Sequence, residues 1–343
     1  MGPRVAQPVR TPASGAPLAA RVYGALASGE FVSGAQLASS LGVSRSAVWK
    51  ATRSLRDLGV SVHAVRNRGY RVPDATEPLD AARLKAALPR DVRDRVRRLE
   101  TVWSIDSTNA ALLARTDLPP GLTDVMLAEF QTAGRGRLGR TWLAPPGGSI
   151  CLSVSWSFPQ LPRDLGALGL AAGVCALRTL RSAGAAGVAL KWPNDLVLEN
   201  SKLGGILLEM RAEAGGPTYI VAGIGINAAL GPALLKKIAD SGTQATDLRA
   251  VGIAAASRAA LVAQLIGSIV RGLEQFEREG LKPFAEEWKR ADALRGRAVN
   301  VLSANHTCRG VARGIDAGGA LLVEAPDGLK KFVSGEVSVR AQS

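Results

Sequence analysis

The sequence predicts an α+β protein in three parts: an N-terminal helical module, a central mixed or antiparallel sheet with helices, and a small C-terminal β-barrel. Three observations support this prediction. Residues 17–74 combine helical periodicity with a basic helix, residues 101–291 alternate strands and helices, and residues 292–343 contain strands only. A chain of 343 residues is long enough to form two or three domains, each with a core of its own.

Composition limits the functions that the chain can have. The net charge is +14, and residues 1–75 carry half of it, so an anionic partner is expected for the N-terminal part. The three cysteines and two histidines are widely separated, which argues against zinc sites, disulfide frameworks and histidine triads and indicates a reduced cytoplasm. No apolar run is long enough to span a membrane, and residues 1–16 read as a disordered tail without a signal peptide.

Residues 17–74 read as a winged helix-turn-helix. Three helices are predicted, of which the second begins with the capping-box pattern of Ser33 and Gln36, and the third follows a turn at Gly42 with Ser44 as its cap. Two short strands, predicted over residues 60–62 and 69–72, form the wing. A fold of this kind places its third helix in the major groove of DNA.

Basic side chains cover the outer face of the predicted third helix and the tip of the wing. We expect contacts to DNA from Ser44, Arg45, Ser46, Trp49, Lys50, Arg53, Arg66 and Arg68. A winged helix that serves only protein contacts, with a solvated basic face, is the alternative at this point.

A linker and an amphipathic helix over residues 79–88 are predicted between residues 75 and 100. In the central part, the predicted helices fall near residues 107–116, 164–183, 232–240 and 254–290. The predicted strands cover residues 124–131, 150–157, 188–191, 196–199, 203–211 and 218–227, with the second one half-buried. Short turns between the later strands indicate antiparallel neighbours. Five further strands are predicted within residues 298–340, which indicates a small closed barrel.

The loop Gly134-Arg-Gly-Arg-Leu-Gly-Arg140, called the Gly-Arg loop below, carries the strongest signal for a bound anion. Glycines allow close approach of the backbone to a ligand, and arginines supply permanently charged forks. The loop also matches the dinucleotide pattern G-x-G-x-x-G. That interpretation fails because residues 141–148 cannot start a helix and no acidic residue follows before Asp164. The chain has no Gly-Lys dipeptide, which excludes a Walker A loop as well.

Five further segments carry polar residues, at the ends of predicted elements or within strands. Ser107-Thr108-Asn109 starts a helix, Gln131 ends a strand, Lys191-Trp-Pro-Asn-Asp195 forms a tight turn, and Lys202-Leu-Gly-Gly-Ile-Leu207 and Gly225-Ile-Asn227 lie in strands. Each has a plain structural explanation when taken alone. Together they contain more glycines and polar residues than a simple core needs, so they predict one polar site.

Five motifs resemble, in their order and approximate spacing, those of biotin protein ligases: Ser107-Thr108-Asn109, the loop Gly134–Arg140, Lys191–Asp195, Lys202–Leu207 and Gly225–Asn227. With the N-terminal module and the C-terminal barrel, the similarity extends over residues 18–341 and resembles the bifunctional ligase–repressor type. The resemblance implies a central domain like that of class II synthetases and an SH3-like barrel. It further implies that biotin and ATP, with Mg²⁺, form biotinyl-5′-AMP. A lysine on the biotin carboxyl carrier domain of a carboxylase would then accept the biotin.

The resemblance also implies roles for individual residues. Lys202, Arg137 and Asp195 would be catalytic, and Asp195 would be the candidate ligand of Mg²⁺. Biotin or its adenylate would contact Ser107, Thr108, Asn109, Gln131, Arg135, Gly136, Arg137, Lys202, Gly205 and Gly225. ATP would contact Arg137, Arg140, Trp142, Lys191, Asn194 and Asn227. The loop from Gly134 to Trp142 would fold over bound biotin and shield the adenylate from water.

Two departures from the family pattern stand out. Leu138 occupies a position where an arginine is common, and residues 228–249 contain no aromatic side chain to pack on adenine. The resemblance implies operator DNA as a partner and a homodimer loaded with biotinyl-5′-AMP. Two alternatives remain at this point: a DNA-binding sensor without ligase activity, and a ligase for a related acid such as lipoate.

Overall fold

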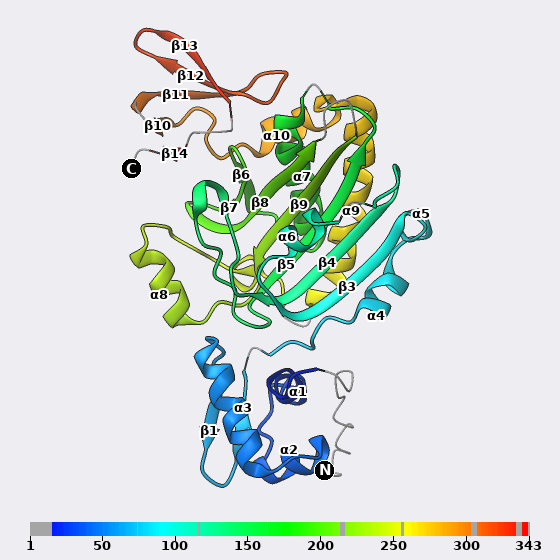
Figure 1. Ribbon diagram of the computed structural model, residues 1–343. Helices are drawn as coiled ribbons and strands as arrows, with labels where there is room; N and C mark the ends of the chain where they lie inside the picture. Colours follow the sequence, from blue (N-terminus) through cyan, green and yellow to red (C-terminus); the bar gives the residue numbers. More distant parts are fainter. Residues whose placement is uncertain are drawn as a thin grey trace.

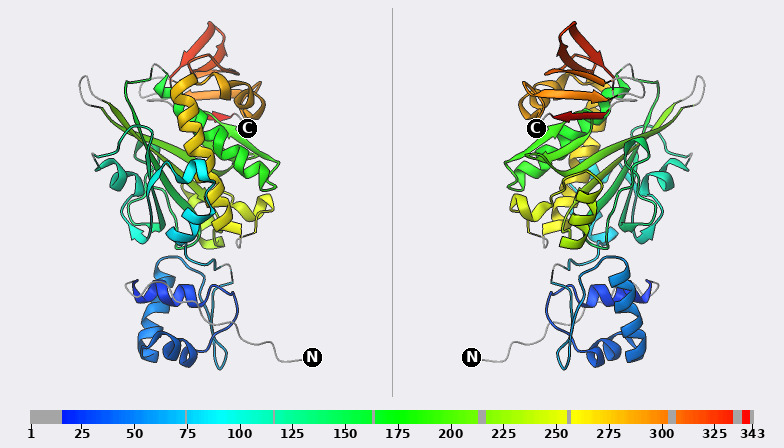
Figure 2. Two further views of the ribbon diagram at one scale, coloured as in Figure 1. Left: turned by 90° about the vertical axis from the view of Figure 1, so that its right-hand side faces the viewer. Right: turned by 90° about the vertical axis from the view of Figure 1, so that its left-hand side faces the viewer.

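The computed structural model describes residues 16–73, 75–115, 117–162, 164–212, 217–254, 257–302, 307–333 and 338–341. The N-terminal module lies at one end, the central sheet with its helices in the middle, and the C-terminal strands at the other end (Figures 1 and 2). The predicted N-terminal tail lies outside the described residues, apart from residue 16. The predicted α+β class is confirmed.

The N-terminal module has the predicted order of elements: α1 (Leu18–Ala25), α2 (Gly34–Leu41), α3 (Arg45–Asp57), β1 (His63–Val65) and β2 (Gly69–Arg71). The capping box is present, because the Ser33 hydroxyl accepts from the Gln36 amide while the Gln36 side chain accepts from the Ser33 amide. The expected first wing strand at residues 60–62 was wrong. Val60 and Val62 are buried in the core of the module, and pairing begins at His63.

The segment after the module contains more structure than the sequence indicated. The predicted helix is confirmed in a shorter form, α4 (Ala81–Ala87), with Asp80 as its cap. A short helix, α5 (Arg90–Arg93), and the edge strand β3 (Val96–Ile105) follow. The central sheet therefore begins five residues before position 101, where we expected the central part to start.

Seven strands form the central sheet. Besides β3 they are β4 (Thr123–Gln131), β5 (Ser149–Phe158), β6 (Val188–Lys191), β7 (Asp195–Leu198), β8 (Ser201–Ala212) and β9 (Thr218–Asn227). Their order is β3-β4-β5-β9-β8-β7-β6, in which β3 and β4 are parallel and the other neighbours are antiparallel. Short connections therefore predicted the antiparallel pairs β6–β7, β7–β8 and β8–β9 correctly.

Helices cover both faces of this sheet. The long helices α7 (Leu168–Ser182) and α9 (Arg258–Glu279), with α10 (Lys282–Ala291), pack on one face, and α6 (Thr108–Leu113) packs on the other (Figure 2). Consequently β5 is buried along its whole length, and the expectation of a half-buried strand was wrong. The single helix expected over residues 254–290 is broken at Gly280, whose φ of 64° ends α9.

An aromatic contact joins the N-terminal module to the sheet. The ring of Tyr23 on α1 lies 5.6 Å from that of Trp103 on β3, which lies 5.8 Å from Phe130 on β4. Gly147, with a φ of 71°, lies against the Tyr23 hydroxyl, where any side chain would overlap it. The module therefore touches the chain just after the Gly-Arg loop.

A buried ion pair fixes the linker at the same junction. The Arg258 guanidinium donates to Glu129 at 2.8 Å and to the Glu77 carbonyl at 3.0 Å, and the Leu79 amide donates to Glu129 at 2.6 Å. Arg258 and Glu129 are both almost fully buried. Because the pair bonds to the backbone of the linker, it holds the linker against the sheet.

The C-terminal part contains five antiparallel strands in the order β13-β12-β11-β10-β14. They are β10 (Ala298–Leu302), β11 (Thr307–Ile315), β12 (Leu321–Ala325), β13 (Gly328–Phe332) and β14 (Ser338–Ala341). Trp192 joins this part to the central sheet, because its indole donates to the Gly319 carbonyl at 3.0 Å. None of the described helices has the length and apolar character that crossing a membrane requires.

Candidate active site and DNA-binding surface

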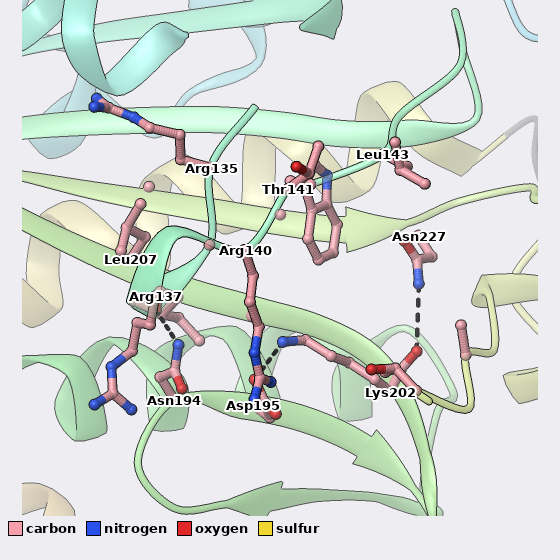
Figure 3. Close-up of a pocket in the computed structure, with 18 of the residues that line it drawn as sticks. Arg135, Arg137, Arg140, Thr141, Leu143, Asn194, Asp195, Lys202, Leu207 and Asn227 are labelled. Atoms are coloured by element: carbon pink, nitrogen blue, oxygen red, sulfur yellow. Dashed lines mark hydrogen bonds and ion pairs between the residues drawn. The ribbon is translucent and has the colours of Figure 1, made fainter. Parts of the chain in front are cut away.

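A cavity of about 860 Å³ brings the five sequence motifs together (Figure 3). It lies where the N-terminus of α6, the end of β4, the Gly-Arg loop and strands β6 to β9 meet. Every residue that we expected to be catalytic or to bind biotin or ATP lines it. These residues are Ser107, Thr108, Asn109, Gln131, Arg135, Gly136, Arg137, Arg140, Trp142, Lys191, Asn194, Asp195, Lys202, Gly205, Gly225 and Asn227.

One end of the cavity is a buried network of hydrogen bonds. The Thr108 amide donates to the Gln131 side-chain oxygen at 2.8 Å. The Ser153 hydroxyl on β5 lies 2.7 Å from the Thr108 hydroxyl and donates to the Asn109 side-chain oxygen at 2.6 Å. Ser107 caps α6 by accepting from the Ala110 amide. Sequence reasoning missed Ser153, because it reads as one of several alternating polar residues in a strand.

The other end of the cavity carries cations. Lys202 at the start of β8 reaches Asp195 on β7, with its Nζ 2.6 Å from a carboxylate oxygen. Gly205 is the register partner of Asp195, and a side chain there would press on the Lys202 ammonium at 3.3 Å. Burial lowers the pKa of the Arg137 guanidinium, while the Asp195 charge opposes this shift. A bound anion would offset the cost of burying this cation.

The Gly-Arg loop is a tight hairpin with no helix after it, so the dinucleotide interpretation is excluded by the structure too. Arg135 bridges to Thr141, and the Gly136 amide donates to the Arg140 carbonyl at 2.7 Å. Leu138 lies at the exposed tip with a φ of 55°. Its side chain is exposed and lies at the rim of the cavity, which it helps to line.

The three arginines of the loop point in different directions. Arg140 extends toward Asp195, Arg137 lies beside Asn194, and Arg135 points away from both (Figure 3). The Arg135 guanidinium lies 3.0 Å from a carboxylate oxygen of Glu209 on β8. Arg137 and Arg140 therefore belong to the charged end of the cavity, and Arg135 does not.

Trp142 closes the cavity at the end of the loop. Its indole packs on the backbone of Gly225, where a Cβ would lie only 2.8 Å from the ring. The Lys202 ammonium lies 6.0 Å from the ring centroid, which is within the range of a weak cation–π contact. Because Gly225 on β9 has no side chain, the Trp142 indole can pack directly on the strand.

Another wall of the cavity comes from residues 243–245, for which the sequence indicated no contact with the site. The Lys202 amide donates to the Gln244 carbonyl at 2.8 Å, and the Thr246 amide donates to the Lys202 carbonyl at 2.9 Å. Asn227 donates to the carbonyls of Thr246 and Lys202. Thr243, Gln244 and Ala245 line the cavity. Nothing in their residue types signals a site, because the contacts that place them come from the backbone.

The eight residues expected to contact DNA are all exposed, along α3 and at the tip of the wing. The core side of α3 is as predicted, with Val48, Thr52 and Leu55 buried. Phe31, which sequence reasoning missed, lies under the wing, and the Arg68 guanidinium stacks on its ring at 4.3 Å. This contact holds a basic side chain of the wing in place.

Metal-binding groups are few in the described part of the chain. It contains no cluster of three or more histidine, cysteine, aspartate or glutamate side chains suited to a metal ion. Asp195 is the one carboxylate among the described residues that line the cavity. Magnesium commonly binds through one or two protein carboxylates and the phosphates of its nucleotide. The donor set therefore fits Mg²⁺ carried by a nucleotide, but not a metal held by the protein alone.

Three family models match the chain, one for each part. Residues 22–71 match a helix-turn-helix domain, residues 103–227 match the biotin/lipoate A/B protein ligase family, and residues 295–340 match the biotin protein ligase C-terminal domain. The order of the three matches is the order of the three parts of the fold.

Curated relatives match two thirds of the chain or more. The bifunctional ligase/repressor BirA of Salmonella typhimurium is 39% identical over 92% of this chain and 95% of its own length. The chain belongs to the bifunctional ligase/repressor family. The biotin–[acetyl-CoA-carboxylase] ligase of Paracoccus denitrificans is 31% identical, over 68% of this chain and 96% of its own.

Solved structures of biotin protein ligases share the fold over about 72% of the chain. The biotin protein ligase of Aquifex aeolicus in complex with biotin and ATP has a TM-score of 0.60 and 26% identity, over 72% of this chain and all of that one. The expectation of a biotin protein ligase with an N-terminal repressor module is therefore confirmed at the level of the family. The roles of the individual side chains remain predictions.

Proposed function

We propose that this protein activates biotin with ATP and transfers it to a lysine of a biotin carboxyl carrier domain, and that it represses transcription from an operator. The observation that carries this proposal is the single cavity in which all sixteen residues expected at the site meet. A buried hydrogen-bonding end and a cationic end, within one cavity, suit a neutral polar ring joined to a carboxylate.

The buried network suits the ureido ring of biotin. Thr108, Asn109, Gln131 and Ser107 present hydroxyl and amide groups that can donate to a carbonyl and accept from N–H groups. A site built from such groups discriminates against ligands that cannot make the same hydrogen bonds, because its own buried polar atoms would then lose partners. Lipoate has no ureido group, so this end of the cavity favours biotin.

The cationic end suits the adenylation step. A carboxylate oxygen of biotin would attack the α-phosphorus of ATP, and pyrophosphate would leave. Both reactants are anions, so the approach needs cations, and Lys202, Arg137 and Arg140 supply them near Asp195. Their benefit grows as charge develops in the transition state. Asp195 would hold Mg²⁺ together with the phosphates, and the metal would neutralise phosphate charge.

The remaining wall suits the nucleoside. Residues 228–249 have no aromatic side chain, but Trp142 presents an aromatic face to the cavity from the loop itself. We place adenine between Trp142 and the segment Thr243–Ala245, with Lys191, Asn194 and Asn227 contacting other parts of ATP. Closure of the loop would exclude water from the reactive mixed anhydride.

The second step and the repressor activity follow from the same arrangement. The lysine of the carrier domain would attack the carbonyl of the adenylate, form an amide and release AMP. The basic face of α3 and the wing would bind one half-site of an operator, and a homodimer loaded with biotinyl-5′-AMP would bind two half-sites. The exposed basic residues support DNA binding over a purely protein-binding role.

One set of assays tests the proposal. Radiolabelled biotin, ATP and a carboxylase carrier domain should give a labelled carrier, and lipoate in excess should not compete. A labelled carrier would reject the alternative of a sensor without ligase activity, whereas its absence would reject the ligase. An electrophoretic shift of a candidate operator should require biotin and ATP. A shift that does not depend on these ligands would contradict the ligand-coupled dimer.

A further inference from the structure

Glu209 on β8 joins two parts of the site that the motifs treat separately. One of its carboxylate oxygens accepts from the Asn109 side-chain amide at 2.9 Å. The other lies 3.0 Å from the Arg135 guanidinium on the Gly-Arg loop. A single carboxylate thus connects the buried hydrogen-bonding end of the cavity with the loop that closes it.

The hydrogen bonds of the buried Asn109 side chain determine the position of Glu209. Asn109 is held by the Ser153 hydroxyl at 2.6 Å and donates to the Leu207 carbonyl at 3.2 Å as well as to Glu209. Gly223 on β9 leaves the space that the Asn109 side chain fills. The orientation of the Asn109 amide is therefore fixed, and with it the place at which Glu209 can receive a cation.

Arg135 is the exposed partner. Its side chain is 49% exposed, against 22% for that of Glu209. It points away from Asp195, while Arg137 and Arg140 lie on the side of the charged end (Figure 3). The charge of Arg135 is thus directed at the framework of the site and not at the region where phosphate would bind.

We propose that Glu209 is a positioning residue that latches the closed Gly-Arg loop through Arg135, from a place set by Asn109. This inference rests on the proposed function, since the loop closes over the ligand of the ligase. A latch of this kind acts on the retention of biotinyl-5′-AMP. It leaves the adenylation step itself to Lys202, Arg137 and Arg140.

Glu209→Gln tests the latch, because glutamine keeps an acceptor for Asn109 but removes the charge that Arg135 needs. We expect biotinyl-5′-AMP to leave about fivefold faster in a chase experiment, as suits a partly exposed ion pair. Single-turnover adenylation should stay within about twofold of wild type. Trypsin should cut the liganded protein faster at the arginines of the loop.

Glu287→Gln is the matched control. The Arg178–Glu287 pair on α7 and α10 has an N–O distance of 2.7 Å and exposed fractions of 41% and 27%, close to those of the latch, but it lies outside the cavity. Its loss should leave both the release rate and the trypsin pattern unchanged. Arg135→Met should release the adenylate faster, and the double variant Arg135→Met/Glu209→Gln should add little to that.

The outcomes separate the latch from the function on which it rests. If wild-type protein forms no biotinyl-5′-AMP, the proposed function fails. If wild type forms it, and Glu209→Gln releases it at the wild-type rate with unchanged trypsin protection, the latch is refuted. Additive effects in the double variant would also refute it. If Glu209→Gln does not fold, the trypsin pattern of liganded Arg135→Met decides, since wild-type protection there would overturn the proposal.

Discussion

Gly225→Ala should disturb nucleotide binding through Trp142. The new Cβ would lie 2.8 Å from one indole carbon and 2.9 Å from a second, whereas ordinary contacts begin at 3.4 Å. The ring must therefore move by about 0.6 Å or the strand must give way, and overpacking of this kind costs about 1–3 kcal/mol. The φ of Gly225 is one that alanine can adopt, so the effect comes from contact alone.

If this cost destabilises the position of Trp142 that nucleotide binding requires, the KM for ATP should rise about 5- to 150-fold. Release of pyrophosphate at varied ATP concentration measures the effect, and thermal unfolding shows whether the fold is intact. Gly169→Ala on α7 is the control, because its Cβ would meet Leu208 at ordinary distances of 3.6 and 3.9 Å. Alanine should even favour the helix there.

A second variant tests whether the indole of Trp142 carries the effect. Trp142→Phe removes the indole carbons that would clash, so Gly225→Ala in that background should change the KM for ATP little further. A Gly225→Ala protein with an unchanged KM and an unchanged unfolding temperature would show that the packing of Trp142 on β9 has no part in nucleotide binding. Equal effects of Gly225→Ala in both backgrounds would lead to the same conclusion.

Three further predictions concern chemistry, stability and reactivity. Lys202→Ala should lose adenylation by at least a hundredfold while its circular dichroism stays that of wild type, and normal turnover would show that the role is misassigned. Glu129→Gln should lower the free energy of unfolding by about 3–5 kcal/mol in urea titration, because it leaves the Arg258 charge buried without its counterion; a loss below about 1 kcal/mol would contradict this. Burial raises the pKa of the Cys151 thiol to about 12. Iodoacetamide at pH 8 should therefore modify the partly exposed Cys308 and spare Cys151 until the protein unfolds. Mass spectrometry can check which cysteine is modified.

Local patterns predicted the elements and motifs whose signals are contained in short stretches of sequence. The caps at Ser33 and Ser44, the inward face of α3 and the antiparallel neighbours each depend on residues close together in the chain. The motif residues also proved to line one cavity, as their combination of glycines and polar side chains had indicated.

What the sequence did not predict depends on contacts between distant segments. Alternation in β5 indicated one exposed face, but α6 packs on that face, and Ser153 becomes part of the site. The pairing of Arg135 with Glu209 joins residues 74 positions apart, and nothing around either residue signals it. The backbone contacts of Gln244 with Lys202 are equally invisible, because any residue type can make them.

The junction at Tyr23 and Glu129 has a consequence for the spacing of operator half-sites. A flexible tether would let two DNA-reading helices adapt to many separations. Here a buried ion pair holds the linker, and the N-terminal module packs on Gly147. Helix α3 therefore keeps a fixed orientation relative to the central sheet. In a two-fold pair of chains, the span between the two α3 helices would then be set by the ligase domains. One inserted base pair would rotate a half-site by about 34°. Two α3 helices at a fixed separation and orientation could not follow this rotation.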